Sequence, residues 1–486
     1  MRKTPAPWVA IIPLTILIAL LSITIYIYGS DSLYGGSQLC LLIASAISVM
    51  IGMKFYGISW KEYEEAISTN VKNVTQALLI ILIIGALSSM WMISGVVPTM
   101  IYYGMKILHP DFFLASTCLI TILVSVTTGS SWATIATIGL ALIGIGISHG
   151  FSEGWVAGAI ISGAYFGDKI SPLSDTTVLA SSMVNVPIMK HIRYMLITTI
   201  PAMVIALIVF TIAGLSHSSM GESQVEMFTS ALDSRFNISL WLLIVPVVTG
   251  IMIARRMSSI ITLFLSAALS GVFAVIFQAD ILREIAQHTE GAWQIVEGIM
   301  TTYFASTSLE STSPLLEELI STRGMGGMLS TLWLIICAMC FGGSMTASGL
   351  LGSLMSVFAR KVKSTFGLVS STVASGLTLN LITADQYISI ILTGQVFRST
   401  YRETGHEDRL LSRSTEDAAT VTSALIPWNS CGMTHSTILG VPTLTYLPYC
   451  FFNILSPIMS LVIAYIGYKI YKPSKKSVTT PIEKTA

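Results

Sequence analysis

Charge is scarce in this chain of 486 residues. Only 10% of the residues are Asp, Glu, Lys or Arg, whereas an ordinary soluble domain has about 25%. The two signs nearly cancel to a formal net charge of +1, so nothing indicates nucleic acid or an acidic soluble partner. Apolar residues make up 53% of the chain, and several runs reach the roughly 20 residues that a membrane helix needs. The composition therefore predicts an all-α polytopic membrane protein.

Cysteine and familiar enzyme motifs are also scarce. Cys337 and Cys340 form a CxxC pattern, but it lies inside an apolar run and has no second pair. We interpret these thiols as packing residues, because neither a disulfide framework nor a zinc site follows from them. The chain has no HExxH motif and no soluble catalytic domain. We therefore expect no enzyme and no bound cofactor.

The apolar segments predict about 11 to 14 membrane crossings, some of them interrupted. The run from Trp8 to Tyr28 is too long for a typical signal peptide and is interpreted as the first membrane helix. Basic clusters, including the one from Arg398 to Arg413, are assigned to the cytoplasm, which places both termini there as well. Glu416 and Asp417 are then expected at a cytoplasmic helix start, near the positive end of the helix dipole.

Two short patterns indicate an internal repeat. The residues 94–97 resemble 348–351 at a displacement of 254, and 175–180 resemble 435–440 at a displacement of 260. The loop charges give the two units opposite orientations, so we expect two inverted repeats with interrupted helices or re-entrant hairpins. The predicted division is N-terminal helices 1–58, first repeat 59–190, connecting helices 191–290, second repeat 291–442, and last helix with tail 443–486.

Acidic residues stand where lipid-soluble sequence is expected. Asp168 and Asp175 flank Pro172 in a hydroxyl-rich stretch between apolar runs. Ionisable groups at membrane depth usually face a protein interior or an aqueous path, and an interrupted helix exposes backbone groups for ion binding. Polar clusters of the same kind recur further along the chain. The candidate ion- or substrate-binding residues are Asp168, Asp175, Ser171, Ser174, Thr176, Ser130, Thr134, Asp385, Thr383, Asn429, Ser430 and His435.

A shared carboxylate offers a simple way to exchange two cations. Sodium prefers oxygen ligands, and Asp168, Asp175 and Asp385 are the candidate sodium-binding carboxylates. A desolvated carboxyl group holds its proton more tightly, so sodium and a proton would compete for it. For each Asp the alternative is a helix cap or an ion pair. His435, at the predicted repeat position of Asp175, is either a proton-linked residue or a packed histidine.

The segments 128–134, 166–177 and 426–430 resemble those of the NhaC-type sodium/proton antiporter family. The resemblance extends over most of the chain, and its acidic motif matches Asp168 and Asp175. It implies a bacterial inner-membrane carrier that exchanges sodium for protons, with sodium as the transported or coupling ion. The family also includes carriers similar to malate/lactate exchangers and carriers linked to amino acids, so the resemblance does not fix the substrate.

Two functions remain open at this point. The first is a sodium/proton antiporter. The second is a sodium- or proton-coupled carrier of a small organic anion or amino acid, for which Lys169 would be an available donor to a substrate carboxylate. The expected partners are sodium, protons and the lipid bilayer, with an organic substrate under the second function and a homodimer as an allowed assembly.

Overall fold

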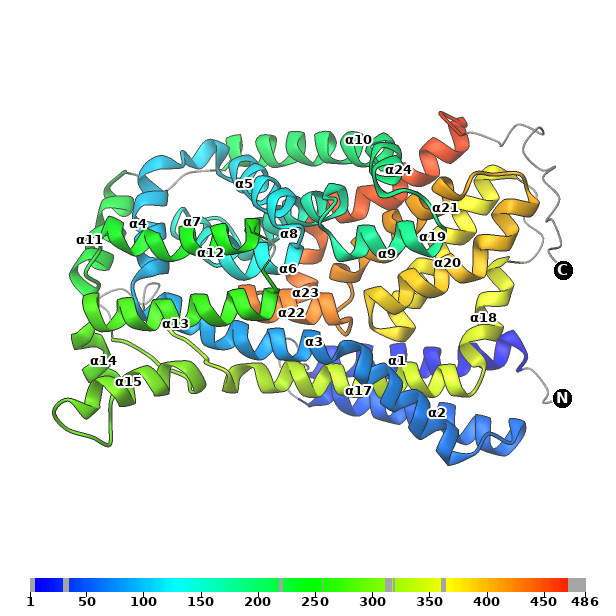
Figure 1. Cartoon of the computed structure of the whole chain (residues 1–486), viewed down its shortest axis with the longest axis horizontal. Helices are drawn as coiled ribbons and strands as arrows, with labels where there is room; N and C mark the ends of the chain where they lie inside the picture. Colours follow the sequence, from blue (N-terminus) through cyan, green and yellow to red (C-terminus); the bar gives the residue numbers. More distant parts are fainter. Residues whose placement is uncertain are drawn as a thin grey trace, which may run out of the picture.

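The computed structural model describes residues 5–28, 35–217, 222–255, 257–310, 317, 320–359 and 364–470. Across these residues the chain folds into helices, together with an isolated antiparallel bridge between Thr307 and Thr322. Nine of the described helices are long and apolar enough to cross a membrane, or up to eleven if each of two bent helix pairs is one span. Figure 1 shows the long helices running mostly parallel to one another. The predicted all-α polytopic class is confirmed, and only the upper count of eleven reaches the lower end of the expected range of crossings.

Two helices at the start of the chain pack against its second half. Helix α1 (Pro7–Tyr28) contacts α2 (Gly36–Tyr56), and α2 contacts α17 (Leu329–Ala347). The hydroxyl groups of Ser45 and Ser344 lie 3.2 Å apart at the contact between α2 and α17. Small polar residues allow membrane helices to approach closely, which is why such contacts are common between spans.

Two sets of helices have the same spacing along the chain. The first set consists of α3 (Trp60–Ile93), α4 (Val96–Ile107), η2 with α5 (Pro110–Thr128), α6, η3 and α7 (Ser131–Ser148), α8 (Glu153–Ile170) and α9 (Asp175–Met183). The second set consists of η5 with α17 (Gly326–Ala347), α18 (Leu350–Ala359), α19 (Thr365–Thr383), α20 (Gln386–Glu403), α21 with η6 and η7 (408–425), and α22 (Ser430–Leu439). Units that begin at 110, 131, 153 and 175 have counterparts that begin at 365, 386, 408 and 430, each 255 positions later. Such constant spacing is the pattern expected of an internal repeat.

The remaining helices connect and follow these two sets. Between them lie α10 (Ile188–Leu215), α11 (Glu222–Arg235), η4 with α12 (Leu240–Ala254), α13 (Ser259–Phe277), α14 (Ala279–Ile285) and α15 (Trp293–Phe304), and after them come α23 (Thr443–Tyr446), η8 (Leu447–Tyr449) and α24 (Phe451–Ile466). Figure 1 shows the blue start of α1 and the red end of α24 toward the same end of the long axis.

Four breaks between helices bring polar backbone into the middle of the molecule. They separate α5 from α6, α8 from α9, α19 from α20, and η7 from α22. Gly129 ends α5 in the left-handed region with a φ of 68°, and Pro172 lies in the break after α8, where its ring is incompatible with a helix interior. Figure 1 places α6, α8 and α22 near the centre of the bundle, with α9 and α20 to their right. The four breaks are therefore the expected location of a functional site.

Candidate functional site

A cavity of about 430 Å³ lies where helix breaks from the two sets come together. Asp168, Asp175 and Asp385 all line it. The rest of its polar lining comes from Asn73, Gln76, Ser130, Trp132, Thr176, Ser259, Gln386, Tyr387 and Ser430. Among these described lining residues there is no Lys or Arg, so the cavity offers carboxylate, hydroxyl and amide oxygens without a fixed positive charge.

Asp168 lies near the end of α8 and is held by the start of α6. Its Oδ2 atom accepts hydrogen bonds from the backbone N–H of Ser131 at 3.2 Å and from the Ser131 hydroxyl at 2.6 Å. Ser130 caps α6, since its Oγ atom accepts a hydrogen bond from the Ala133 N–H at 3.2 Å. Asp168 as a whole residue is 6% exposed. A helix start thus supplies neutral donors to a nearly buried carboxylate.

Asp385 is positioned by the corresponding break in the second set. It caps α20, with Oδ1 accepting from the Ile388 N–H at 2.9 Å, while Oδ2 accepts from the Ser430 hydroxyl at 3.3 Å. Ser430 in turn donates its backbone N–H to the carbonyl of Ala384 at 2.8 Å. The sequence alternative of a helix cap is therefore correct for Asp385, and the same side chain also lines the cavity.

The two breaks around Ser130 and Asp385 have the same backbone shape. Gly129 and Ala384 have φ angles of 68° and 56°, and the residues that follow have φ angles of −146° and −143°. A threonine precedes each turn and contacts a hydroxyl in the next helix, at 3.3 Å from Thr128 to Thr134 and 3.1 Å from Thr383 to Ser389. Thr134 and Thr383 therefore hold the turns and are not among the cavity lining residues.

Asp175 opens α9 and is the most exposed of the three acids. Ser174 caps this helix by accepting from the Thr177 N–H at 3.3 Å, and its hydroxyl lies 3.0 Å from that of Thr176. A second cavity shares Asp175 and Ser130 and extends to Ser258, in the connection between α12 and α13. The acidic cavity therefore adjoins a second cavity beside the connection between α12 and α13.

The other predicted residues support the breaks without lining the acidic cavity. Ser171 donates its hydroxyl to the Val126 carbonyl at 2.9 Å, and Asn429 caps α22 while its amide donates to the Asn380 carbonyl at 3.2 Å. His435 is fully buried and bonds the Tyr165 hydroxyl at 2.8 Å. By the spacing of 255, Asp175 corresponds to Ser430. The predicted equivalence of His435 and Asp175 is therefore wrong, because a match of a few hydroxyl and apolar letters was five residues out of register.

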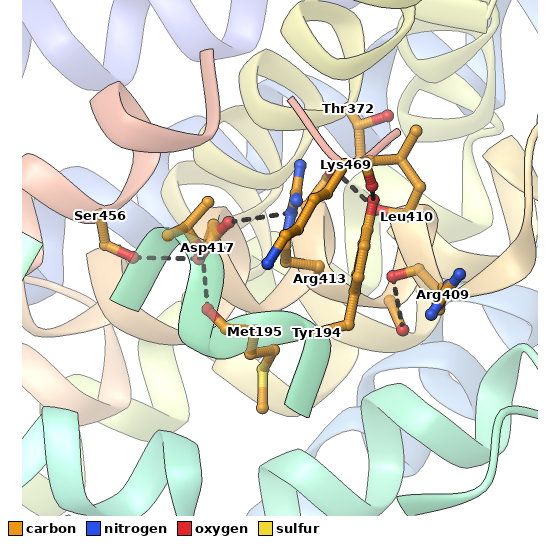
Figure 2. Close-up of polar contacts among 12 residues, drawn as sticks. Tyr194, Met195, Thr372, Arg409, Leu410, Arg413, Asp417, Ser456 and Lys469 are labelled. Carbon is orange, nitrogen blue, oxygen red and sulfur yellow. Dashed lines mark hydrogen bonds and ion pairs between the residues drawn. The ribbon is translucent and has the colours of Figure 1, made fainter. Parts of the chain in front are cut away.

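An ionic cluster that the sequence did not reveal lies behind the cavity. Lys169 donates to Asp417 Oδ1 and to the Ser456 hydroxyl, the latter at 2.8 Å. Arg413 Nε lies 3.9 Å from Asp417 Oδ2, and all three ionic side chains have no exposed surface. Figure 2 shows Asp417 between Ser456 and Arg413. Lys169 is thus committed to Asp417 and is not the free donor that an organic anion would need.

The expected positions of Arg413 in a loop and of Glu416 and Asp417 at a helix start are also corrected. Arg413, Glu416 and Asp417 are fully buried within the helical unit 408–425. This unit corresponds by spacing to α8, so its charged first half is as much part of the bundle as the apolar second half. Charge density alone indicated a loop here, whereas Asp417 forms ion pairs with Lys169 and Arg413 inside the protein.

The three aspartates share a cavity but do not converge on one point. Among the described residues, no three His, Cys, Asp or Glu side chains come close enough to hold a metal ion together. Ser130 and Ser430 line the same cavity, so hydroxyl oxygens lie in the region of Asp168. Asp385 and Asp175 are then separate carboxylates along the same cavity.

Broken helices around an acid-lined cavity in a polytopic bundle define the class of secondary active transporters. Residues 163–468 match the model of the Na+/H+ antiporter family, and the chain belongs to this family.

Relatives of known name are similar over nearly their whole length. The chain is 36% identical to the malate-2H(+)/Na(+)-lactate antiporter of Bacillus subtilis, with 91% of this chain and 92% of the relative covered. It is 34% identical to the Na(+)/H(+) antiporter NhaC of Alkalihalophilus pseudofirmus, with 89% and 90% covered. It is also 32% identical to the arginine/ornithine antiporter ArcD of Halobacterium salinarum, with 97% and 94% covered.

Proposed function

We propose that this protein exchanges sodium for protons by alternating access, and that the two ions compete for the aspartates of the central cavity. The observation that carries the proposal is the lining itself, with three carboxylates from two sets of helices and no Lys or Arg among the described residues. Such a lining attracts cations and gives an anion no positive partner. The family to which the chain belongs agrees with this cargo.

The exchange follows from occupancy of one site by one ion at a time. Sodium at Asp168 requires the ionised carboxylate and the oxygen ligands around it, and a proton on the same carboxyl group removes the charge that holds sodium. The Ser131 donors keep the carboxylate oriented while it is empty. The chain therefore needs no separate coupling device, because each ion leaves when the other arrives.

Alternating access requires that the cavity open to each side in turn. We propose that the two sets of helices, spaced by 255 residues, are repeats of opposite orientation that exchange inward-open and outward-open forms. We propose the divisions 1–58, 59–190, 191–290, 291–442 and 443–486 on this basis. A bacterial inner-membrane location with both termini in the cytoplasm agrees with the basic clusters of the sequence.

A second candidate is a sodium- or proton-coupled carrier of a small organic anion or amino acid. The cavity volume of about 430 Å³ favours it, since ligand pockets typically measure about 300–1,000 Å³. Two of the relatives above are named for organic cargo. A carboxylate cargo would have to enter an acid-lined cavity, so we rank this candidate below cation exchange.

Flux in proteoliposomes distinguishes the two functions. The purified full chain is reconstituted with an internal pH dye, and proton movement is recorded after a sodium gradient is imposed. Labelled malate, lactate and arginine are tested in parallel with and without sodium. We expect sodium-driven proton movement without organic cargo, and raising the proton concentration on the sodium side should raise the apparent KM for sodium without lowering the maximal rate.

Asp175→Asn is the variant for this assay. We expect it to abolish sodium-dependent proton movement, because an amide neither carries the proton nor supplies the negative charge. Asp233→Asn is the matched control, since Asp233 is an exposed carboxylate on α11 away from the cavity. Wild-type kinetics in Asp175→Asn would remove this residue from the site, and proton movement that requires malate, lactate or arginine would favour the second candidate.

A further inference from the structure

A third cavity, separate from the acidic one, is lined by basic side chains. It measures about 430 Å³ and lies where the start of α10 meets α21 and the residues after α24. Of its seven described lining residues, four are basic and none is acidic: Met189, Lys190, Arg193, Tyr194, Ile197, Arg409 and Lys469. The two cavities share no described lining residue. Their charges are also of opposite sign.

The basic residues converge from three parts of the chain. Lys190 and Arg193 stand on the first turns of α10, Arg409 on α21 and Lys469 just after α24. The positive-inside tendency explains basic residues at this end of a membrane protein, but it does not require them to gather around one hollow. Arg409 forms an ion pair with Glu407, and the other three basic residues give the pocket a net positive charge.

Tyr194 forms the wall of this basic pocket. Its ring lies 4.8 Å from the guanidinium group of Arg409 and 4.7 Å from that of Arg413, and Figure 2 shows the two arginines on opposite sides of the ring. The Tyr194 hydroxyl donates to the carbonyl of Lys469 at 3.0 Å, which joins α10 to the end of α24. The pocket is therefore a fixed feature of packed helices.

An apolar face of α10 begins beside the pocket. Ile200, Val204, Ile208 and Ile212 are exposed and recur every four residues, which places them along one side of the helix. Met189, at the pocket itself, is also exposed. Figure 1 shows α10 along the upper edge of the bundle. A molecule with an anionic head and an apolar tail matches both features.

We propose that the basic pocket binds a phosphate-bearing anion, and that this anion is the headgroup of an anionic phospholipid whose acyl chains lie along α10. Arg193 presents a planar guanidinium group suited to phosphate oxygens, and Lys190 and Lys469 add positive charge. Basic pockets between membrane helices bind lipid headgroups through the same chemistry. Free inorganic phosphate has the same charged group as the lipid headgroup, but it has no apolar part that could contact the exposed face of α10.

Thermal unfolding of the purified full chain in a neutral detergent tests this site. Short-chain phosphatidylglycerol is titrated in one arm and inorganic phosphate in the other. The pocket variant is Lys190→Gln with Arg193→Gln, and both side chains are exposed, so folding should be retained. The matched control is Lys54→Gln with Lys61→Gln, which removes the same charge from exposed positions outside the pocket.

We expect phosphatidylglycerol to raise the unfolding midpoint of the wild type and the control, and the pocket variant to need roughly tenfold more lipid for the same shift. Stabilisation by inorganic phosphate with the same dependence on the pocket variant, and none by lipid, would support the phosphate site and assign it to a free anion. No stabilisation by either ligand, or equal weakening in both charge pairs, would overturn the proposal.

Discussion

Asp168 and Asp417 are both buried carboxylates, yet their surroundings differ in one respect that decides what each can do. Asp168 receives neutral donors from Ser131 and faces a cavity with no basic lining residue among those described. Asp417 is bonded to Lys169 and has Arg413 nearby, with no exposed surface. The negative charge of Asp417 is therefore already matched by positive charge inside the protein, whereas that of Asp168 meets the neutral donors of Ser131.

The contrast is sharpened because Lys169 and Asp168 are neighbours in the chain. Successive residues on a helix point in different directions, so one turn at the end of α8 serves the cavity with Asp168 and the ionic cluster with Lys169. The ion pair of Lys169 with Asp417 holds the end of α8 in place, and Asp168 at the same helix end lines the cavity. We infer that the cluster positions Asp168 without itself contacting the transported ions.

The largest expected effect comes from Asp168→Asn. The amide oxygen still accepts from Ser131, so the break between α8 and α9 should keep its shape while the carboxylate charge is lost. We expect sodium-dependent proton movement to disappear in the reconstituted assay while the thermal unfolding midpoint stays within the range of the Asp233→Asn control. Retained transport with unchanged sodium and pH dependence would return Asp168 to a structural role.

Asp417→Asn should have the opposite profile. Loss of this carboxylate leaves Lys169 charged in a dry interior, and breaking a buried ion pair on one side costs about 3–5 kcal/mol. We expect a large fall in the unfolding midpoint and in the amount of folded protein, measured on detergent-solubilised samples by thermal unfolding and size-exclusion chromatography.

A double variant separates charge burial from a need for this particular pair. Lys169→Met together with Asp417→Leu removes both ions, and apolar replacement of a buried pair is often nearly neutral. We expect it to recover part of the stability, since Arg413 remains beside the altered position. Stability of Asp417→Asn equal to that of wild type would show that Lys169 does not depend on this partner.

The residues of the acidic cavity could be predicted from the sequence. Burying a carboxylate between apolar runs costs free energy, so such a residue is a candidate for a functional site. Asp168, Asp175 and Asp385 were found this way, and the structure brings all three to one cavity. Local composition also indicated the break after α8, through Pro172. Their roles as ion ligands remain a prediction. Composition does not predict which residues of other helices each carboxylate contacts in the folded bundle.

Arg413 and Asp417 show why the rest was missed. Composition assigns a charged stretch to water, but opposite charges from Lys169, Arg413 and Asp417 meet only after the chain has folded. The spacing of 255 would have corrected this, since α8 begins at Glu153 and its counterpart at Asp408. The weak match between residues 175–180 and 435–440, at a displacement of 260, suggested a different alignment of the two repeats. In that alignment His435 was the equivalent of Asp175.

Glu297 is a third kind of carboxylate and carries the smallest expected effect. It lies on α15, outside the predicted spans, and accepts hydrogen bonds from the Thr289 hydroxyl at 2.6 Å, from the backbone N–H of Gln287 and from His288. The Thr289 hydroxyl is the main reason why the pKa of Glu297 falls from 4.5 to about 2. The ionised form thus holds the connection between α14 and α15.

A depressed pKa stabilises the folded connection above the ordinary value and loses that effect as pH falls toward the folded value. In the wild type, hydrogen exchange of residues 287–289, corrected for intrinsic rate, should therefore speed up between pH 4.5 and pH 2. Glu297→Gln should exchange faster at neutral pH and show little further change over that interval, with sodium transport unaffected. If exchange in the wild type were independent of pH there, the ionised Glu297 would not be what holds this connection, and only Asp168 and Asp417 would remain as carboxylates with contrasting tasks.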